Sequence, residues 1–276
     1  MELVSIKTTG DKIPDAPLFR IGQPGLFVKE IEEALLAGII DLAVHSAKDL
    51  PSRLPEGLIL GAVLARADYR DVLVSDRPGG LASLPPGARV GTSGLRRQAQ
   101  LLALRPELRL RPVRGNVGTR LGKIGPEVEA VLLAAAGLDR LGLQPPHAQR
   151  LDPVEMLPAA GQGVLALEIR QDDARMAELL LPLHHQPTGL TLAAERGFLE
   201  ALGGGCQVPA AALARPLEDG LLLEALIADP SGERLLRGRK AAPAAEPEAA
   251  ANLGRALAAE LLARGGTQIL QDLVST

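Results

Sequence analysis

Between residues 88 and 143 the sequence runs ARVGTSGLRRQAQLLALRPELRLRPVRGNVGTRLGKIGPEVEAVLLAAAGLDRLGL. Three short strand-like runs can be separated in it, and each is followed by a helical pattern: ARV before LRRQAQLLALR, LRLRPV before VGTRLGKI, and AVLLAA before GLDRLGL. Alternation of strand and helix at this spacing is typical of a parallel, doubly wound sheet. The stretch therefore predicts an α/β domain whose ligands bind at the carboxyl ends of the strands.

On both sides of this stretch the pattern continues, with a change towards the C-terminal end. Upstream, apolar periodicity predicts a helix over 28–39 and strands over 41–46, 58–66 and 71–75. Downstream, the prolines of 145–158 predict a crossing linker, and 163–169 a further strand. From about residue 187 a helix, a glycine-rich loop, three strand-like runs and a helix over 245–264 follow in that order. Strands grouped together with flanking helices predict a small α+β domain.

Composition excludes several classes of function. Aromatic residues make up 1% of the chain and the net charge is −3, so neither base stacking nor a general attraction to polyanions is available for binding nucleic acid. No apolar run has the length of a membrane span. A single cysteine cannot form an internal disulfide, which suits a reducing compartment. We expect a globular, cytoplasmic protein that binds neither nucleic acid nor membrane.

Basic and hydroxyl side chains recur where the predicted strands give way to helices. These residues are Thr92, Ser93, Arg96, Arg97, Arg114, Arg120 and Arg140. Basic residues in a first helical turn oppose the helix dipole, so their repetition at one edge of a sheet indicates an anionic ligand; solvated surface arginine is the alternative for any one of them. The sequence has neither a P-loop nor a G-x-G-x-x-G after a strand, which favours carboxylates over phosphates as the anionic groups.

A second polar cluster, His45-Ser46-Ala47-Lys48-Asp49, follows the strand predicted over 41–46. Asp49 is either a turn residue or a carboxylate in a cation-rich cleft, where it could stabilise a cationic intermediate or move a proton. His45 forms no nucleophile triad with any evident partner. His184 and His185 lack companion metal ligands, so we expect no metal site.

The only cysteine, Cys206, follows three glycines just past a predicted helix. A lone cysteine is commonly a small buried apolar residue. On a glycine-rich loop near the surface, however, an exposed thiol is a liability unless the protein uses it. Cys206 is therefore a candidate for covalent chemistry.

Over nearly its whole length the sequence resembles the hydroxymethylbilane synthase (porphobilinogen deaminase) family. The segments that carry the resemblance are KTTGDK (7–12), LFVKEIE (26–32), DLAVHSAKDLP (41–51), VGTSGLRRQAQL (90–101), VRGNVGTRLGK (113–123), AAAGLDRLGL (134–143), LPAAGQGVLALE (157–168) and AAERGFLEALGGGCQVP (193–209). Each segment alone is moderately specific. Eight of them in the same order and at compatible spacing leave little room for coincidence.

The resemblance implies three domains. Two are doubly wound α/β domains like those of type II periplasmic binding proteins, and the third is a small α+β domain that carries the cysteine. We expect domain 1 to comprise residues 1–64 and 164–184, domain 2 residues 65–163, and domain 3 residues 185–276. Family members usually begin with a further strand, a turn resembling I-G-T-R-x-S-x-L-A and a helix, and this region normally supplies an arginine and a serine to the site. We therefore expect domain 1 to be incomplete at its N-terminal end.

The resemblance also implies an activity and a cofactor. The enzyme is a transferase of tetrapyrrole (porphyrin and heme) biosynthesis that joins four porphobilinogen molecules head-to-tail, with loss of ammonia, and then releases linear hydroxymethylbilane by hydrolysis. The primer is a dipyrromethane cofactor linked through a thioether to Cys206. Asp49 is implied as the catalytic carboxylate. Ser46, Lys48, Thr92, Ser93, Arg96, Arg97, Arg114, Arg120 and Arg140 are implied as ligands of the cofactor's acid side chains.

The partners implied are porphobilinogen and the growing oligopyrrole, with uroporphyrinogen III synthase as a candidate recipient of the product, and the protein is expected to be a monomer. A different class of function stays open from the residues alone, namely a non-catalytic two-domain clamp for a small polycarboxylate. Such a clamp needs neither the Asp49 carboxylate nor the GGGC loop. A phosphate-ester transferase is disfavoured by the missing P-loop and by the lack of a metal cluster.

Overall fold

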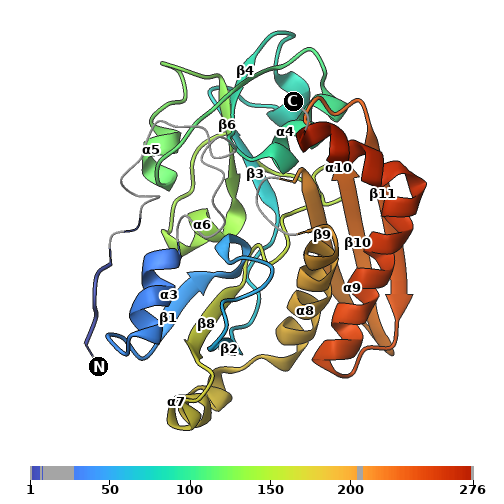
Figure 1. The fold of residues 1–276 in the computed structure, drawn as a ribbon. Coiled ribbons are helices and arrows are strands. Elements are labelled where there is room, and N and C mark those ends of the chain that lie inside the picture. Colours follow the sequence, from blue (N-terminus) through green and yellow to red (C-terminus); the bar gives the residue numbers. More distant parts are fainter. Residues whose placement is uncertain (1, 7, 9–27, 204–207, 275–276) are drawn as a thin grey trace.

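The computed structural model describes residues 2–6, 8, 28–203 and 208–274, and these form three β-sheets with helices packed around them (Figure 1). Sheet A has the strand order β1-β8-β2, sheet B the order β5-β4-β6-β3-β7, and sheet C the order β11-β10-β9. In Figure 1 sheet A lies below sheet B, and sheet C stands beside both.

Sheet B contains the three strands of the stretch 88–143, whose alternation of strand and helix predicts an α/β domain, and one strand from each side of it. Its strands are β3 (Asp71–Ser75), β4 (Arg89–Gly91), β5 (Arg109–Arg111), β6 (Ala130–Ala134) and β7 (Ala148–Arg150). The helices that follow the parallel strands are α4 (Leu95–Leu104), α5 (Val117–Leu121) and α6 (Ala135–Arg140). Strands β5, β4 and β6 are parallel, so their carboxyl ends and the beginnings of α4, α5 and α6 share one edge. All five residues of β3 are buried, as expected of a strand covered on both faces.

Sheet A joins two early strands to a late one. β1 (Ala43–Ser46) and β2 (Leu58–Val63) both pair antiparallel with β8 (Leu165–Arg170), which lies between them. Helix α3 (Lys29–Leu36) packs against this sheet, and α7 (Ala174–Leu180) follows β8. The chain therefore crosses between sheets A and B twice, once between β2 and β3 and once between β7 and β8. The two crossings are hydrogen-bonded to each other, since the Ala67 N–H donates to the Gly163 carbonyl at 2.9 Å.

Sheet C is an antiparallel meander of β9 (Ala210–Leu217), β10 (Gly220–Ala228) and β11 (Leu235–Ala242), covered by α8 (Gln186–Ala201) and α9 (Pro247–Leu261). The two helices approach closely at glycines: a Cβ atom on Gly254 would lie 2.1 Å from the Ala194 carbonyl oxygen. Gly265, at φ 112°, ends the helical path of α9, and α10 (Thr267–Val274) follows. The other face of sheet C packs on α4, so this unit is attached to the helix that carries Arg96 and Arg97.

The α/β class expected from the sequence is confirmed, and several local predictions differ. Sheet B is mixed rather than wholly parallel, because β3 runs antiparallel to both of its neighbours, β6 and β7, whereas β5, β4 and β6 pair in parallel. The segment 145–158, predicted as a linker, contains β7, and the sequence pattern did not predict α7. The domain boundaries stay a prediction.

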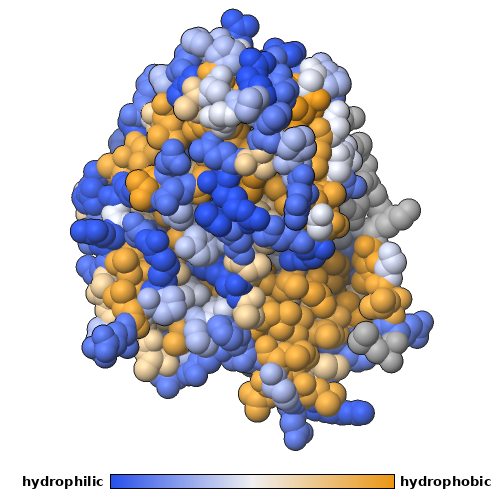
Figure 2. Space-filling view, turned by 180° about the vertical axis from the view of Figure 1, so that it is seen from behind, coloured by the Kyte–Doolittle hydropathy of each residue, from blue (hydrophilic) through white to orange (hydrophobic). Residues whose placement is uncertain are grey.

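An apolar area covers part of one face of the molecule. Figure 2 shows this area from behind, in the lower part of the molecule where sheet A and α7 lie. Exposed apolar side chains of these elements include Val44 on β1 and Leu179 on α7, with 59% and 60% exposure. No helix of the described ranges is both long enough and apolar enough to cross a bilayer.

Candidate active site

A cavity of about 280 Å³ opens between the end of β1 and the edge of sheet B where α4, α5 and α6 begin. Its lining residues are Ser46, Lys48, Asp49, Arg97, Gly115, Asn116, Val117, Arg120, Leu133, Ala134, Ala136, Gly137, Arg140, Gly163 and Val164. The cavity therefore lies where two parallel strands of sheet B end, as expected for an α/β fold.

The first wall comes from the turn after β1. Strand β1 ends at Ser46, and Ala47–Asp49 form one turn of 3₁₀ helix, η1. The Ala47 N–H donates to the Val164 carbonyl at 2.9 Å, and the Ala47 and Leu50 side chains are buried. Ala47 and Leu50 are thus anchored in the core, and Lys48 and Asp49 between them line the cavity. The opposing backbone is close: a Cβ on Gly161, whose φ is 73°, would lie only 3.0 Å from atoms of Ala47.

Lys48 is a partly buried lysine in this wall. Its Nζ lies 3.5 Å from Oε1 of Gln162. Burial lowers the pKa of Lys48 from 10.5 to about 8; the charge of Asp49 opposes this shift and that of Arg97 adds to it. Lys48 is thus mostly protonated at pH 7 and able to bind an anion, and it loses this charge in mildly alkaline solution.

The second wall carries three arginines from three consecutive helices. Arg97, Arg120 and Arg140 lie on α4, α5 and α6. Nε of Arg120 donates to the Gly115 carbonyl at 2.8 Å, which holds the side chain against its own helix. Burial and then the charge of Arg97 lower the pKa of Arg120 from its ordinary value, though arginine stays protonated at any physiological pH. Among the residues that the structure describes, the charged lining is therefore four cations and one carboxylate, Asp49, so the cavity attracts ligands that carry several negative charges.

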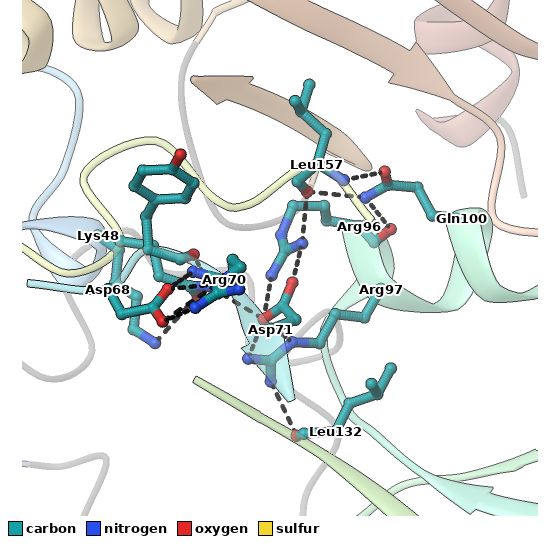
Figure 3. Close-up of polar contacts among 11 residues, drawn as sticks. Lys48, Asp68, Arg70, Asp71, Arg96, Arg97, Gln100, Leu132 and Leu157 are labelled. Atoms are coloured by element: carbon teal, nitrogen blue, oxygen red, sulfur yellow. Dashed lines mark hydrogen bonds and ion pairs between the residues drawn. The ribbon is translucent and has the colours of Figure 1, made fainter. Parts of the chain in front are cut away.

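Asp71, at the start of β3, is shared by two arginines (Figure 3). Arg96 contacts both its carboxylate oxygens, at 2.7 and 3.3 Å, and Arg97 contacts Oδ1 through Nε at 3.0 Å and Nη2 at 2.7 Å. Asp71 is fully buried. Burial alone would raise the pKa of Asp71, but the charges of Arg96 and Arg97 outweigh it and hold that pKa far below its usual range. Because two guanidinium groups pair with one carboxylate, the cluster of Asp71, Arg96 and Arg97 keeps a net positive charge. Of the two arginines, only Arg97 lines the cavity.

The replacement Asp71→Asn is expected to lower the free energy of unfolding by about 3–5 kcal/mol at pH 7, because it leaves two buried guanidinium groups without their anion. The folded-state pKa of Asp71 is depressed, so its stabilising effect is present above the ordinary value of 3.8 and is lost as the pH falls through the folded-state pKa. Urea unfolding at several pH values measures this. The difference in the free energy of unfolding between the wild type and the variant should be constant from pH 5 to 7 and narrow only in stronger acid. This result would support the depressed pKa of Asp71.

The control for this experiment is Asp76→Asn. Asp76 pairs with Arg77 at a partly exposed position, where an ion pair is worth about 0–1 kcal/mol. An equal loss of stability in both variants would contradict the special role of the buried group.

A separate buried cluster lies behind β1. His45 Nε2 is 2.9 Å from Glu168 Oε2 on β8, and Glu32 of α3 is buried nearby. Burial first, then the charge of Glu168, raises the pKa of Glu32 to about 7. These groups lie outside the cavity lining.

The variant Glu32→Gln is expected to remove a pH dependence of stability. A folded-state pKa raised above the ordinary 4.5 gives stability that is fully present below pH 4.5 and lost as the pH rises through about 7. Unfolding followed from pH 4.5 to 8 should show the wild-type protein losing up to about 3 kcal/mol more than the variant over this range. Glu33→Gln, at an exposed position of the same helix, serves as the control. Parallel curves for Glu32→Gln and the wild type would contradict the expectation.

The structure brings together part of the predicted site. Ser46, Lys48, Asp49, Arg97, Arg120 and Arg140 line one cavity, whereas Thr92, Ser93, Arg96 and Arg114 are not among its lining residues. Thr92 is buried, Ser93 Oγ donates to the Val113 carbonyl at 2.9 Å, and Arg96 is held by Asp71 and by the Leu157 carbonyl. Cys206 lies outside the described residues. The ligand roles of all these residues stay predictions.

Three neighbours of the site were not predicted from the sequence. They are Asp71, Gln162 and Asn116, which caps α5 by accepting from the Thr119 N–H at 2.9 Å. An acidic residue at the head of an otherwise apolar strand was the available signal for Asp71. In the described part of the chain no group of three or more His, Cys, Asp or Glu side chains is placed to hold a metal ion.

Comparison with known proteins gives a consistent result. Residues 1–178 match the family model "Porphobilinogen deaminase, dipyromethane cofactor binding domain", and residues 190–263 match "Porphobilinogen deaminase, C-terminal domain". Among curated proteins, the porphobilinogen deaminase of Nitratidesulfovibrio vulgaris is 50% identical over 278 residues, covering 100% of this chain and 87% of that protein. That of Moorella thermoacetica is 52% identical over 276 residues, covering 98% and 86%, and that of Syntrophotalea carbinolica is 53% identical over 272 residues, covering 98% and 85%.

Proposed function

Because the chain belongs to the porphobilinogen deaminase family, we propose that the cavity between sheets A and B holds the growing pyrrole chain and that Asp49 is its catalytic carboxylate. The protein is a transferase, hydroxymethylbilane synthase, which joins four porphobilinogen molecules with loss of ammonia and releases the linear product. Its cofactor is dipyrromethane. This activity distinguishes it from a clamp that only binds polycarboxylates.

The residues of the cavity fit the cofactor and the substrate chemically. Pyrrole units with acetate and propionate side chains are polyanions with flat apolar rings. Lys48, Arg97, Arg120 and Arg140 supply cations for the carboxylates, and Ser46 supplies a hydroxyl. Apolar lining from Val117, Leu133 and Val164 can cover the ring faces. We propose the same ligand role for the residues predicted beside the cavity: Thr92, Ser93, Arg96 and Arg114.

The role of Asp49 follows from its sign of charge among these cations. Loss of ammonia from porphobilinogen leaves a cationic, electrophilic substrate, and carbon–carbon bond formation leaves a pyrrole that must lose a proton. When bound, dipyrromethane supplies the nucleophilic carbon that begins the chain. In this proposal the carboxylate of Asp49 stabilises the substrate's positive charge at both stages and receives the proton. The arginines would repel such a cation, so the single anion among the described lining residues is the group suited to this task.

One observation carries the proposal: among the described residues, the turn after β1 and helices α4, α5 and α6 bring four cations and a single carboxylate into the lining of one cavity. Attachment of the cofactor to Cys206 rests on the family's GGGC motif. We extend the proposal to the three domain ranges predicted above and to a cytoplasmic monomer whose product is taken up by uroporphyrinogen III synthase.

The test is a mass measurement joined to an activity assay. The intact mass of the denatured protein should exceed the mass of the chain by two linked pyrrole units, and the protein should convert porphobilinogen to hydroxymethylbilane. Retention of an unmodified mass after incubation with porphobilinogen, together with no product, would refute the proposal.

A further inference from the structure

Gln162, in the second crossing between the sheets, contacts the groups that carry charge in both walls of the site. It is 1% exposed. Its Nε2 donates to the Tyr69 carbonyl at 2.8 Å and to Asp71 Oδ1 at 3.0 Å, and its Oε1 accepts from Lys48 Nζ at 3.5 Å. One side chain thus joins the cation of η1 to the carboxylate that holds Arg97.

Only an amide satisfies this set of neighbours. The Tyr69 carbonyl and the Asp71 carboxylate accept hydrogen bonds, so the nitrogen end of Gln162 must face them, and its oxygen then faces Lys48. A glutamate in this place would set a second carboxylate against Asp71. An alanine would leave the Tyr69 carbonyl without its donor and Lys48 without its acceptor.

The main chain of Gln162 is fixed from the other side. Its carbonyl accepts from Arg66 Nε at 2.9 Å, and Arg66 is paired with Glu195 of α8 at 2.5 and 3.1 Å. Glu195 is fully buried and also accepts from the Gly161 N–H at 2.7 Å. Because contacts with both crossings and with α8 hold its backbone, Gln162 has a fixed position between sheets A and B.

We propose that Gln162 is a positioning residue, which holds Lys48 at a fixed spacing from Arg97 so that the two cations bind carboxylates of one ligand. The inference rests on the proposed function, since it concerns the same cavity. Without the tether, the long lysine side chain regains its rotamer freedom and must lose it on binding, so affinity falls while the chemistry at Asp49 is unchanged.

The first test does not depend on turnover. The chain has six lysines, so the ¹³Cε resonances of labelled lysine can be resolved and that of Lys48 assigned with the variant Lys48→Arg. The charged groups that face Lys48 are Asp49, Asp71, Arg96 and Arg97. Gln162→Glu adds a carboxylate at the position of Oε1 and is expected to move the titration of Lys48 upward by about one pH unit or more. An unchanged titration would overturn the inference.

The second test uses the protein as isolated, with its cofactor, and porphobilinogen as the substrate. Gln162→Ala is expected to raise KM about tenfold while kcat stays within about twofold, the pattern of lost binding rather than lost chemistry. Gln149→Ala is the matched control, because Gln149 is also a structural glutamine, accepting from the Leu81 N–H at 2.7 Å far from the cavity. It should change neither KM nor the titration of Lys48. Equal losses of kcat in both glutamine variants, or an unchanged KM in Gln162→Ala, would count against the positioning role.

The two tests separate the inference from the proposed function. A wild-type protein that carries no pyrrole and makes no product refutes the proposed function, yet the titration of Lys48 still decides whether Gln162 holds it. Conversely, if the wild type is active and the Gln162 variants change neither KM nor the titration of Lys48, the inference alone is refuted.

Discussion

Asp49→Asn is expected to lower kcat at least about 10³-fold while leaving the covalent cofactor in place. The replacement keeps the shape of the side chain and removes its charge. In the described part of the chain, Asp49 is the one carboxylate in the lining of a cavity whose other charged groups are Lys48 and three arginines. Without it, a cationic substrate intermediate would face these four cations, and the proton released on bond formation would lose the acceptor that we propose for it.

The measurement is initial rates of hydroxymethylbilane formation by protein whose cofactor content has been checked by mass. Asp219→Asn, at an exposed position in the turn between β9 and β10, is the control and should retain the wild-type rate. A variant at Asp49 with turnover within tenfold of wild type would exclude the proposed role. Loss of the cofactor instead of turnover would show that Asp49 serves binding.

Cys206→Ser is expected to abolish covalent attachment of the cofactor altogether. Cys206 carries the only thiol in the chain, and a serine hydroxyl is far less nucleophilic than a thiol at neutral pH. The denatured variant should therefore have the mass of the bare chain, and steady-state turnover should fall below detection because each chain of pyrroles lacks its anchor.

A second variant, Cys206→Ala, removes both thiol and hydroxyl and should behave in the same way. Circular dichroism and the unfolding midpoint report whether the apoprotein is folded. Detection of the two-pyrrole increment in either variant would place the attachment on another residue and disprove the assignment.

The sequence predicted the parts of the fold that depend on local order. The alternation over 88–143 became the parallel part of sheet B, and the apolar face of 28–39 became α3. Pairings between distant segments were not predictable in the same way. Nothing in the pattern of 163–169 indicates that this strand lies between β1 and β2, because an antiparallel central position and a parallel one need the same apolar residues.

The site shows the same division. Residues in one local motif, such as Ser46, Lys48 and Asp49, were predicted together because the turn that presents them is encoded in consecutive residues. Arg96 and Arg97 are adjacent arginines that the sequence pattern does not distinguish, yet Arg97 lines the cavity and Arg96 does not. Both are held by Asp71, which approaches them only in the folded chain, but Arg96 also donates to the Leu157 carbonyl and Arg97 to the Leu132 carbonyl. Buried ion pairs of this kind depend on tertiary structure and leave little trace in periodicity.

The central place of β8 in sheet A has a consequence for synthesis on the ribosome. About one hundred residues separate the end of β2 from the start of β8, so at roughly 5–20 residues per second β1 and β2 emerge some 5–20 s before their shared partner. Sheet B, whose strands all lie within that interval of chain, can form first. Nascent chains should therefore pass through a stage in which sheet B is folded while β1 and β2 are still unpaired, apolar strands. At this stage a chaperone would be needed.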